Sequence, residues 1–170
     1  MVPIDLEKQK QMTYMLKRAY HYLKYRPRTI VEMRTFLQEK ASQKHIDEDV
    51  IEMVIDELVG FKYLNDAAFV TWYMDGRYLS RKKSQSLLRR EIEHLGVDRL
   101  LIEQVLGEPE RDEDVDKAAQ AVSALWRRSA NLPSLKRRQK ATQYLLRRGY
   151  SYDTIKNAIA KQGEDDYNRP

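Results

Sequence analysis

A chain of 170 residues with 42% hydrophobic side chains is long enough to bury a continuous core. It contains no cysteine, which excludes disulfides, thiolate zinc sites and cysteine nucleophiles. No segment approaches the ~20 apolar residues of a membrane span, and no signal-peptide pattern opens the sequence, so we expect a cytoplasmic protein without membrane contact. The 31 lysines and arginines exceed the 26 acids, which suits a polyanion or an acidic protein surface as partner.

Apolar residues recur at helical spacing along almost the whole chain, and no segment alternates with the period of a strand. Glycine, proline and short polar runs divide this pattern into nine short helices. The breaks include residues 26–28, 60–66, 80–83, 96, 107–109, 132–133 and 149. The sequence therefore predicts an all-α fold.

The first three helices are expected within residues 9–62. Thr29 and Glu32 have the spacing of a capping box, in which each side chain accepts a hydrogen bond from the other's backbone N–H, so a helix should begin there. Relative to the segments that follow, this one has extra residues around 42–45, which we interpret as a loop insertion.

Residues 63–108 and 112–162 repeat one three-helix pattern at a constant offset of 53 residues. The offset sets Phe69, Trp72, Ile92, Gly96 and Ile102 against Val122, Leu125, Leu145, Gly149 and Ile155. The first segment matches the same pattern, since Leu16 pairs with Phe69 and Ile51 with Ile102. We predict three tandem three-helix repeats in a curved, elongated, monomeric array, followed by a flexible acidic tail over 163–170.

Fourteen lysines and arginines form two clusters in the second and third repeats. They are Arg77, Arg81, Lys82, Lys83, Arg89, Arg90, Arg127, Arg128, Lys136, Arg137, Arg138, Lys140, Arg147 and Arg148. A solvated helix face normally has acids three or four positions from its bases, and residues 127–148 contain none. We predict a face that binds a partner or DNA, although charge alone does not choose between phosphates and acidic protein.

Neither a metal site nor a catalytic site is indicated. The three histidines are too scattered to share a ligand, no nucleophile, base and orienting group come together, and no glycine-rich phosphate loop is present. Trp72 and Trp126 occupy neighbouring positions of the repeat and are expected to pack rather than to stack on unpaired bases. We therefore expect no enzyme activity, no metal and no cofactor.

One segment of the second repeat resembles a known family. Its residues are Leu64-Asn65-Asp66-Ala67-Ala68-Phe69, then Trp72, Arg77, Leu88-Arg89-Arg90-Glu91-Ile92 and Leu95-Gly96-Val97. This order resembles the RecX regulatory family, whose architecture is also a tandem array of three-helix repeats, and the likeness covers nearly the whole chain. Ser84-Gln85 stands where family members usually have Gly-Pro, which leaves the start of that helix open.

The resemblance implies a modulator of the bacterial recombinase RecA. Such a protein binds along the groove of the RecA filament on single-stranded DNA and limits ATP hydrolysis, strand exchange or filament growth, which restrains recombination and the SOS response. Three alternatives remain open: a stand-alone DNA-binding module with helix-turn-helix-like units, a scaffold without nucleic acid, and an enzyme with scattered carboxylates. The resemblance does not say which residues contact RecA and which contact DNA.

Overall fold

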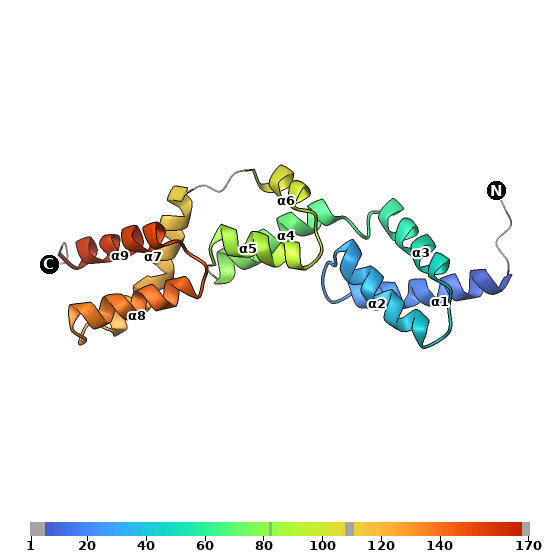
Figure 1. The fold of residues 1–170 in the computed structure, drawn as a ribbon, viewed down its shortest axis with the longest axis horizontal. Coiled ribbons are helices and arrows are strands. Elements are labelled where there is room, and N and C mark those ends of the chain that lie inside the picture. The colour runs from blue at the N-terminus through green and yellow to red at the C-terminus, as the bar shows by residue number, and fades with distance from the viewer. Residues whose placement is uncertain (1–5, 82, 108–110, 168–170) are drawn as a thin grey trace. The chain divides into compact units, whose positions relative to one another are not determined.

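The computed structural model describes residues 6–81, 83–107 and 111–167. All regular structure in these residues is helical (Figure 1), as the sequence predicts. The helices are α1 (Leu6–Leu23), α2 (Ile30–Ser42), α3 (Glu48–Gly60), α4 (Asp66–Arg81), α5 (Gln85–His94), α6 (Arg99–Leu106), α7 (Arg111–Arg128), α8 (Ser134–Leu146) and α9 (Tyr152–Tyr167). The all-α fold is thereby confirmed, while the curvature of the array stays a prediction.

The chain divides into two compact units. Unit 1 comprises Met1–Thr71 and Ile92–Val105, and unit 2 comprises Trp72–Glu91 and Leu106–Pro170. The division runs through α4, α5 and the end of α6, so it follows none of the predicted repeat limits, 9–62, 63–108 and 112–162, which stay predictions.

The end of the described chain differs from the predicted flexible tail over 163–170. Helix α9 continues through Tyr167, so the backbone of residues 163–167 is helical, and residues 168–170 lie outside the described part. The only break signal before that point is Gly163, and a single glycine costs a helix only about 1 kcal/mol.

In unit 1, helices α1, α2 and α3 enclose one apolar core. Met15 and Ala19 of α1, Met33 and Leu37 of α2, and Val54 of α3 are fully buried there. Within α1 and within α2 the two residues are four positions apart, so they lie on one face of the helix. Burial of such side chains contributes about 1.5–3 kcal/mol each for the larger ones, which makes this core the main stabilising element of unit 1.

In unit 2, helices α7, α8 and α9 enclose a second core, in which small residues let the helices approach closely (Figure 1). Ala118 of α7 and Ala158 of α9 are fully buried. Trp126 is 6% exposed at the end of α7, as predicted. Trp72 is 40% exposed and lies edge-on against Tyr73 rather than in a core, which corrects the prediction for that residue.

The same turn follows the second helix of each repeat. Each turn contains a residue with positive φ, namely His45 at 53°, Gly96 at 91° and Gly149 at 83°. The next residue then donates its N–H back to a carbonyl of the helix. These bonds are Ile46 to Ala41 at 3.1 Å, Val97 to Ile92 at 3.4 Å and Tyr150 to Leu145 at 3.3 Å. The three turns define which residues correspond between repeats.

Aligning the turns shows where the extra residues of the first repeat lie. Ala41 and Ile92 correspond at the helix ends, and α2 has 13 residues against 10 in α5. The additional residues therefore form one more turn of α2, and the predicted loop insertion around 42–45 is wrong. An apolar stripe recurs at nearly every helical turn, so a shift by one turn preserves the pattern and the sequence comparison missed it.

The start of α2 is capped as the sequence predicts. Glu32 donates its N–H to the Thr29 Oγ1 at 3.0 Å, and the Thr29 N–H donates to the Glu32 Oε2 at 3.2 Å. The next N–H, of Ile30, donates to the Asp66 Oδ1 at 3.0 Å. Thr29 also donates its hydroxyl to the Leu95 carbonyl at 2.7 Å, which holds the start of α2 against the turn that follows α5.

The start of α5 repeats this contact in unit 2. The Leu87 N–H donates to the Ser84 Oγ at 3.2 Å, so Ser84 caps the helix and Gln85 is its first residue. The Ser84 hydroxyl donates to the Gly149 carbonyl at 2.8 Å. Ser84 thus has the role of Thr29, and it settles where the helix begins in spite of the missing Gly-Pro pair.

Candidate functional site

The solvent-facing side of α8, together with the residue that caps its end, carries three cations. Lys136, Lys140 and Arg147 are four and seven residues apart, so they lie on one side of the helix, and all three are exposed. The opposite side of α8 buries Ala141 and Leu145. We call Lys136, Lys140 and Arg147 the basic stripe.

No carboxylate neutralises the basic stripe within the described part of the chain. Helix α8 contains no acid, and the described ion pairs of unit 2 are Lys83 with Glu91 and Lys161 with Asp116. Three same-signed charges without interleaved acids raise the local positive potential, which attracts anionic partners. The stripe therefore supports the part of the predicted binding face that the sequence placed on Lys136, Lys140 and Arg147.

Two other arginines of the predicted face are held by aromatic rings. The Arg137 guanidinium lies 4.1 Å from the centre of the Trp126 ring, and its Nε donates to the Trp126 carbonyl at 3.0 Å. The Arg148 guanidinium lies 3.7 Å from the centre of the Tyr144 ring. Cation–π contacts of this kind contribute about 0.5–2 kcal/mol, so these arginines have a packing role.

The remaining cations of the third repeat lie elsewhere. Arg127 and Arg128 are exposed in the last turn of α7, where positive charge complements the helix dipole, and the Arg128 Nε donates to the Ala124 carbonyl at 3.2 Å. Arg138 lies on the side of α8 that faces α9, away from the basic stripe. One continuous run in the sequence is thus distributed over several surfaces.

The cluster of the second repeat is partly engaged in internal bonds. Lys83 forms an ion pair with Glu91, which also accepts a hydrogen bond from the Tyr73 hydroxyl at 3.0 Å. Arg89 donates from Nη2 to the Gly107 carbonyl at 2.8 Å. Arg90 is exposed. The predicted residues Arg77 and Arg81 are described only in their backbone, and Lys82 lies outside the described residues.

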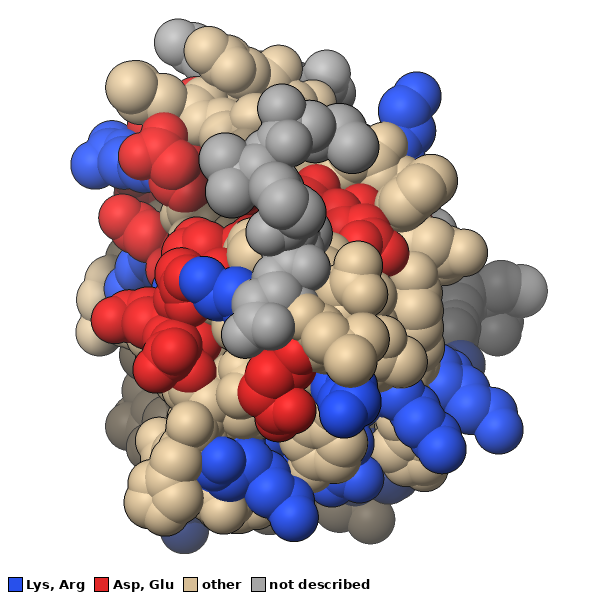
Figure 2. Space-filling view, turned by 90° about the vertical axis from the view of Figure 1, so that its right-hand side faces the viewer, with Lys and Arg blue, Asp and Glu red and all other residues tan. Residues whose placement is uncertain are grey.

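Acidic residues concentrate on helix α3 of unit 1 instead. Helix α3 contains no lysine or arginine, and its acids are Glu48, Asp49, Glu52, Asp56 and Glu57. Figure 2 looks onto the side of the molecule that is at the right in Figure 1 and shows acidic side chains gathered over much of this face. The third helix of the first repeat therefore has the opposite electrostatic character to α8.

Neither a metal cluster nor a membrane-spanning helix is found in the described residues. No three histidine, aspartate or glutamate side chains there converge on a position that could hold a metal ion. None of the described helices is both long enough and apolar enough to cross a membrane.

Comparison with known proteins places these features in a family. A model of the first three-helix domain of RecX matches residues 16–58, and a model of the third three-helix domain of RecX matches residues 112–159. The chain belongs to the RecX family. The resemblance expected from the second repeat is confirmed, and so is the repeat organisation of the fold.

Several RecX proteins are similar over most of the chain. The regulatory protein RecX of Bacillus licheniformis is 29% identical over 89% of this chain and 55% of its own length, and that of Halalkalibacterium halodurans is 30% identical over 96% and 64%. A crystal structure of RecX from Lactobacillus salivarius aligns with a TM-score of 0.76 at 23% identity, covering 91% of this chain and 98% of its own. The chain thus spans little more than half of the Bacillus relative.

These relatives carry the name regulatory protein RecX. Two residues that the sequence analysis did not select, Tyr152 and Lys156, line a groove beside Arg138 in this RecX chain. The signal for Lys156 was available, because it corresponds to Glu52 of the first repeat and so reverses a charge. This change of charge could be recognised only after the turns had shown which residues correspond between the repeats.

Proposed function

We propose that this chain binds the RecA filament on single-stranded DNA and limits its ATP hydrolysis, strand exchange or extension. It acts in the cytoplasm as a monomer without a cofactor, and it contacts the filament through the basic stripe. Support comes from membership of the RecX family and from one observation above all, the three exposed cations on α8 and at its C-cap, with no acid on the helix.

The basic stripe suits such a filament for a physical reason. A filament on DNA presents negative groups at regular intervals. Lysine and arginine donate charge-assisted hydrogen bonds to phosphates and to carboxylates alike. A helix with cations on one side can lie along that surface while its other side stays in the core of unit 2. Arg137 holds this helix against Trp126 of α7, whereas Arg148 packs on Tyr144 of α8 itself, and neither arginine is proposed as the contact.

The decisive experiment measures ATP hydrolysis by RecA on single-stranded DNA with increasing amounts of the chain. We expect inhibition at amounts well below RecA. The variant Lys136→Glu, Lys140→Glu, Arg147→Glu should need at least about tenfold more protein for the same inhibition, since each lost charge contact costs roughly 0.5–1 kcal/mol or more. Arg137 is left unchanged because its reversal would disturb the contact with Trp126.

The matched control is Lys17→Glu, Arg18→Glu, Lys24→Glu, which reverses three exposed cations of unit 1 in and directly after α1. It should inhibit like the unchanged chain. Equal weakening by both variants would mean that only net charge matters. Absence of inhibition, together with direct salt-sensitive DNA binding, would support the stand-alone DNA-binding module instead.

A further inference from the structure

We call the line of contact between the second and third helices of a repeat its seam. The seam between α2 and α3 corresponds to the seam between α8 and α9. Helices α2 and α8 each have 13 residues, and the turns after them are the same, with His45 and Gly149 at the positive φ. By this correspondence Arg138 is the counterpart of Arg34. Lys156 is likewise the counterpart of Glu52.

In the first repeat the seam is closed by an ion pair. Arg34 donates from Nε to the Glu52 Oε1 at 2.9 Å and from Nη2 to the Glu52 Oε2 at 2.8 Å. Two parallel hydrogen bonds of this kind are the preferred way for arginine to bind a carboxylate. Glu48 and Asp56, one turn before and after Glu52, add negative potential around Arg34.

In the third repeat no acidic residue stands at the corresponding positions of α9. The counterparts of Glu48, Glu52 and Asp56 are Tyr152, Lys156 and Ala160. No carboxylate among the described residues pairs with Arg138, and Lys156 at the counterpart position repels it. The chain keeps the arginine of the seam but not its anion.

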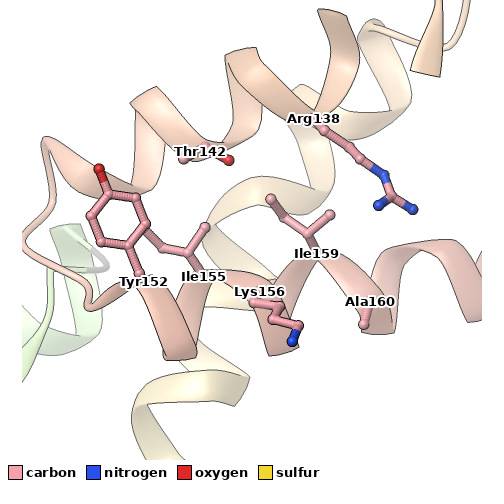
Figure 3. A pocket seen from close by; sticks show the side chains of 7 residues that line it. All are labelled: Arg138, Thr142, Tyr152, Ile155, Lys156, Ile159 and Ala160. Atoms are coloured by element: carbon pink, nitrogen blue, oxygen red, sulfur yellow. The ribbon is translucent and has the colours of Figure 1, made fainter. Parts of the chain in front are cut away.

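A groove of about 350 Å³ lies at this place between α8 and α9. Figure 3 shows Ile155 and Ile159 between the two helices, with Tyr152 and Arg138 at opposite ends. Ile155 and Ile159 are four residues apart on α9 and only 2% and 8% exposed, so their edges form the floor of the groove, and the exposed ring of Tyr152 extends this apolar surface. The groove therefore combines an apolar surface with two cations, Arg138 and Lys156, and no anion.

We propose that this groove binds an acidic amphipathic segment of a partner protein. A carboxylate of that segment bonds to Arg138 in the way that Glu52 bonds to Arg34, and an apolar side chain beside the carboxylate packs on Ile155 and Ile159. Lys156 adds positive potential. The inference goes beyond the proposed function, because neither the basic stripe nor RecA is needed for it.

The observations favour a peptide over nucleic acid. The floor consists of aliphatic side chains at helical spacing, which is the surface that an amphipathic helix takes. Arg138 is two residues from Lys136 and nine from Arg147, which places it on the opposite side of α8 from the basic stripe, so a phosphate backbone bound to the stripe is turned away from the groove. The counterpart anion in the first repeat is a carboxylate.

The test measures binding of a fluorescein-labelled, end-blocked helical peptide, with glutamates four residues apart beside leucines, to the full chain by fluorescence anisotropy. Lys156→Glu supplies the missing carboxylate from within, as in the first repeat, and should weaken binding at least about tenfold. The matched control Lys17→Glu makes the same charge change at an exposed lysine of α1 and should stay within about threefold of the unchanged chain.

Arg138→Gln should also weaken binding, which keeps the test decisive if Lys156→Glu lowers the melting temperature. Undiminished binding by both groove variants, or equal loss in Lys17→Glu, would overturn the proposal. A third result would also overturn it: an oligothymidylate displaces the peptide from the unchanged chain and does not bind to the Lys156→Glu variant. The groove would then be a nucleic-acid site. None of these readouts involves RecA, so failure here leaves the proposed function standing.

Discussion

Gly149 has a role that only glycine can fill. Its φ of 83° lies in the left-handed region, and a Cβ there would be 2.5 Å from the Leu87 Cβ and 2.8 Å from the Ser84 Oγ. A Cβ cannot rotate out of such a contact, so the turn after α8 or the start of α5 would have to move. The hydroxyl bond from Ser84 to the Gly149 carbonyl depends on the same close approach.

Gly149→Ala should therefore lower the free energy of unfolding by about 2–4 kcal/mol, from the positive φ and the steric overlap together. The matched control is Gly107→Ala, because Gly107 also has positive φ, at 64°, but a Cβ there would meet nothing within 4 Å. That control should cost only about 1 kcal/mol. Urea unfolding followed by circular dichroism measures both, and equal losses would contradict the steric part of the argument.

At the scale of helices, the Arg34–Glu52 pair joins α2 to α3 and makes their packing depend on pH. The hydrogen bond from Arg34 lowers the pKa of the Glu52 carboxyl below its ordinary value of 4.5. A lowered pKa means that the folded state favours the charged form. The pair thus stabilises unit 1 fully above about pH 4.5, and this contribution is lost as pH falls through the lowered pKa.

Glu52→Gln should destabilise the chain at pH 7 by under about 1 kcal/mol, because the paired side chains are 36% and 45% exposed and solvent screens them. The difference from the unchanged chain should shrink as pH falls below about 4.5, in thermal melts over a pH series. Glu93→Gln, which removes an exposed carboxylate of α5, is the control. A Glu52→Gln deficit of the same size at every pH would mean that the ion pair is not its cause.

The helices themselves could be predicted from sequence because each has a local signal. The capping pair Thr29 and Glu32 marks the start of α2, and Gly96 and Gly149 mark the turns after α5 and α8. The length of α2 could not be predicted, since a helix extended by one turn keeps its apolar stripe. The side of α8 on which each cation lies could not be predicted either, because that requires knowing where the helix begins. The single basic run of the sequence therefore did not reveal that its members divide into a solvent-facing stripe, two stacked arginines and Arg138 in the groove.

For the whole molecule, acids are gathered on α3 and bases on α8. The salt dependence of the affinity for a polyanion should therefore arise from a few residues. Binding to single-stranded oligothymidylate should weaken as salt rises, with a slope that reflects the number of phosphates neutralised. Lys136→Gln, Lys140→Gln, Arg147→Gln should reduce the magnitude of that slope by about 2, at roughly 0.7 for each contact removed.

The corresponding triple change in unit 1, Lys17→Gln, Arg18→Gln, Lys24→Gln, should leave the salt slope unchanged. Anisotropy titrations over a series of potassium chloride concentrations supply both slopes. If the unit 1 variant lowers the slope as much as the stripe variant does, the contact with phosphate is not confined to α8.

The contact between a capping hydroxyl and the turn of the following repeat makes the order of the repeats matter. Thr29 meets the turn of Gly96, and Ser84 meets the turn of Gly149, whereas α8 starts after Pro133, which has neither a hydroxyl nor an N–H. The first turn has His45, whose side chain is exposed. The repeats are consequently not interchangeable modules: shuffled into third place, the first would put a histidine side chain against the hydroxyl of Ser84.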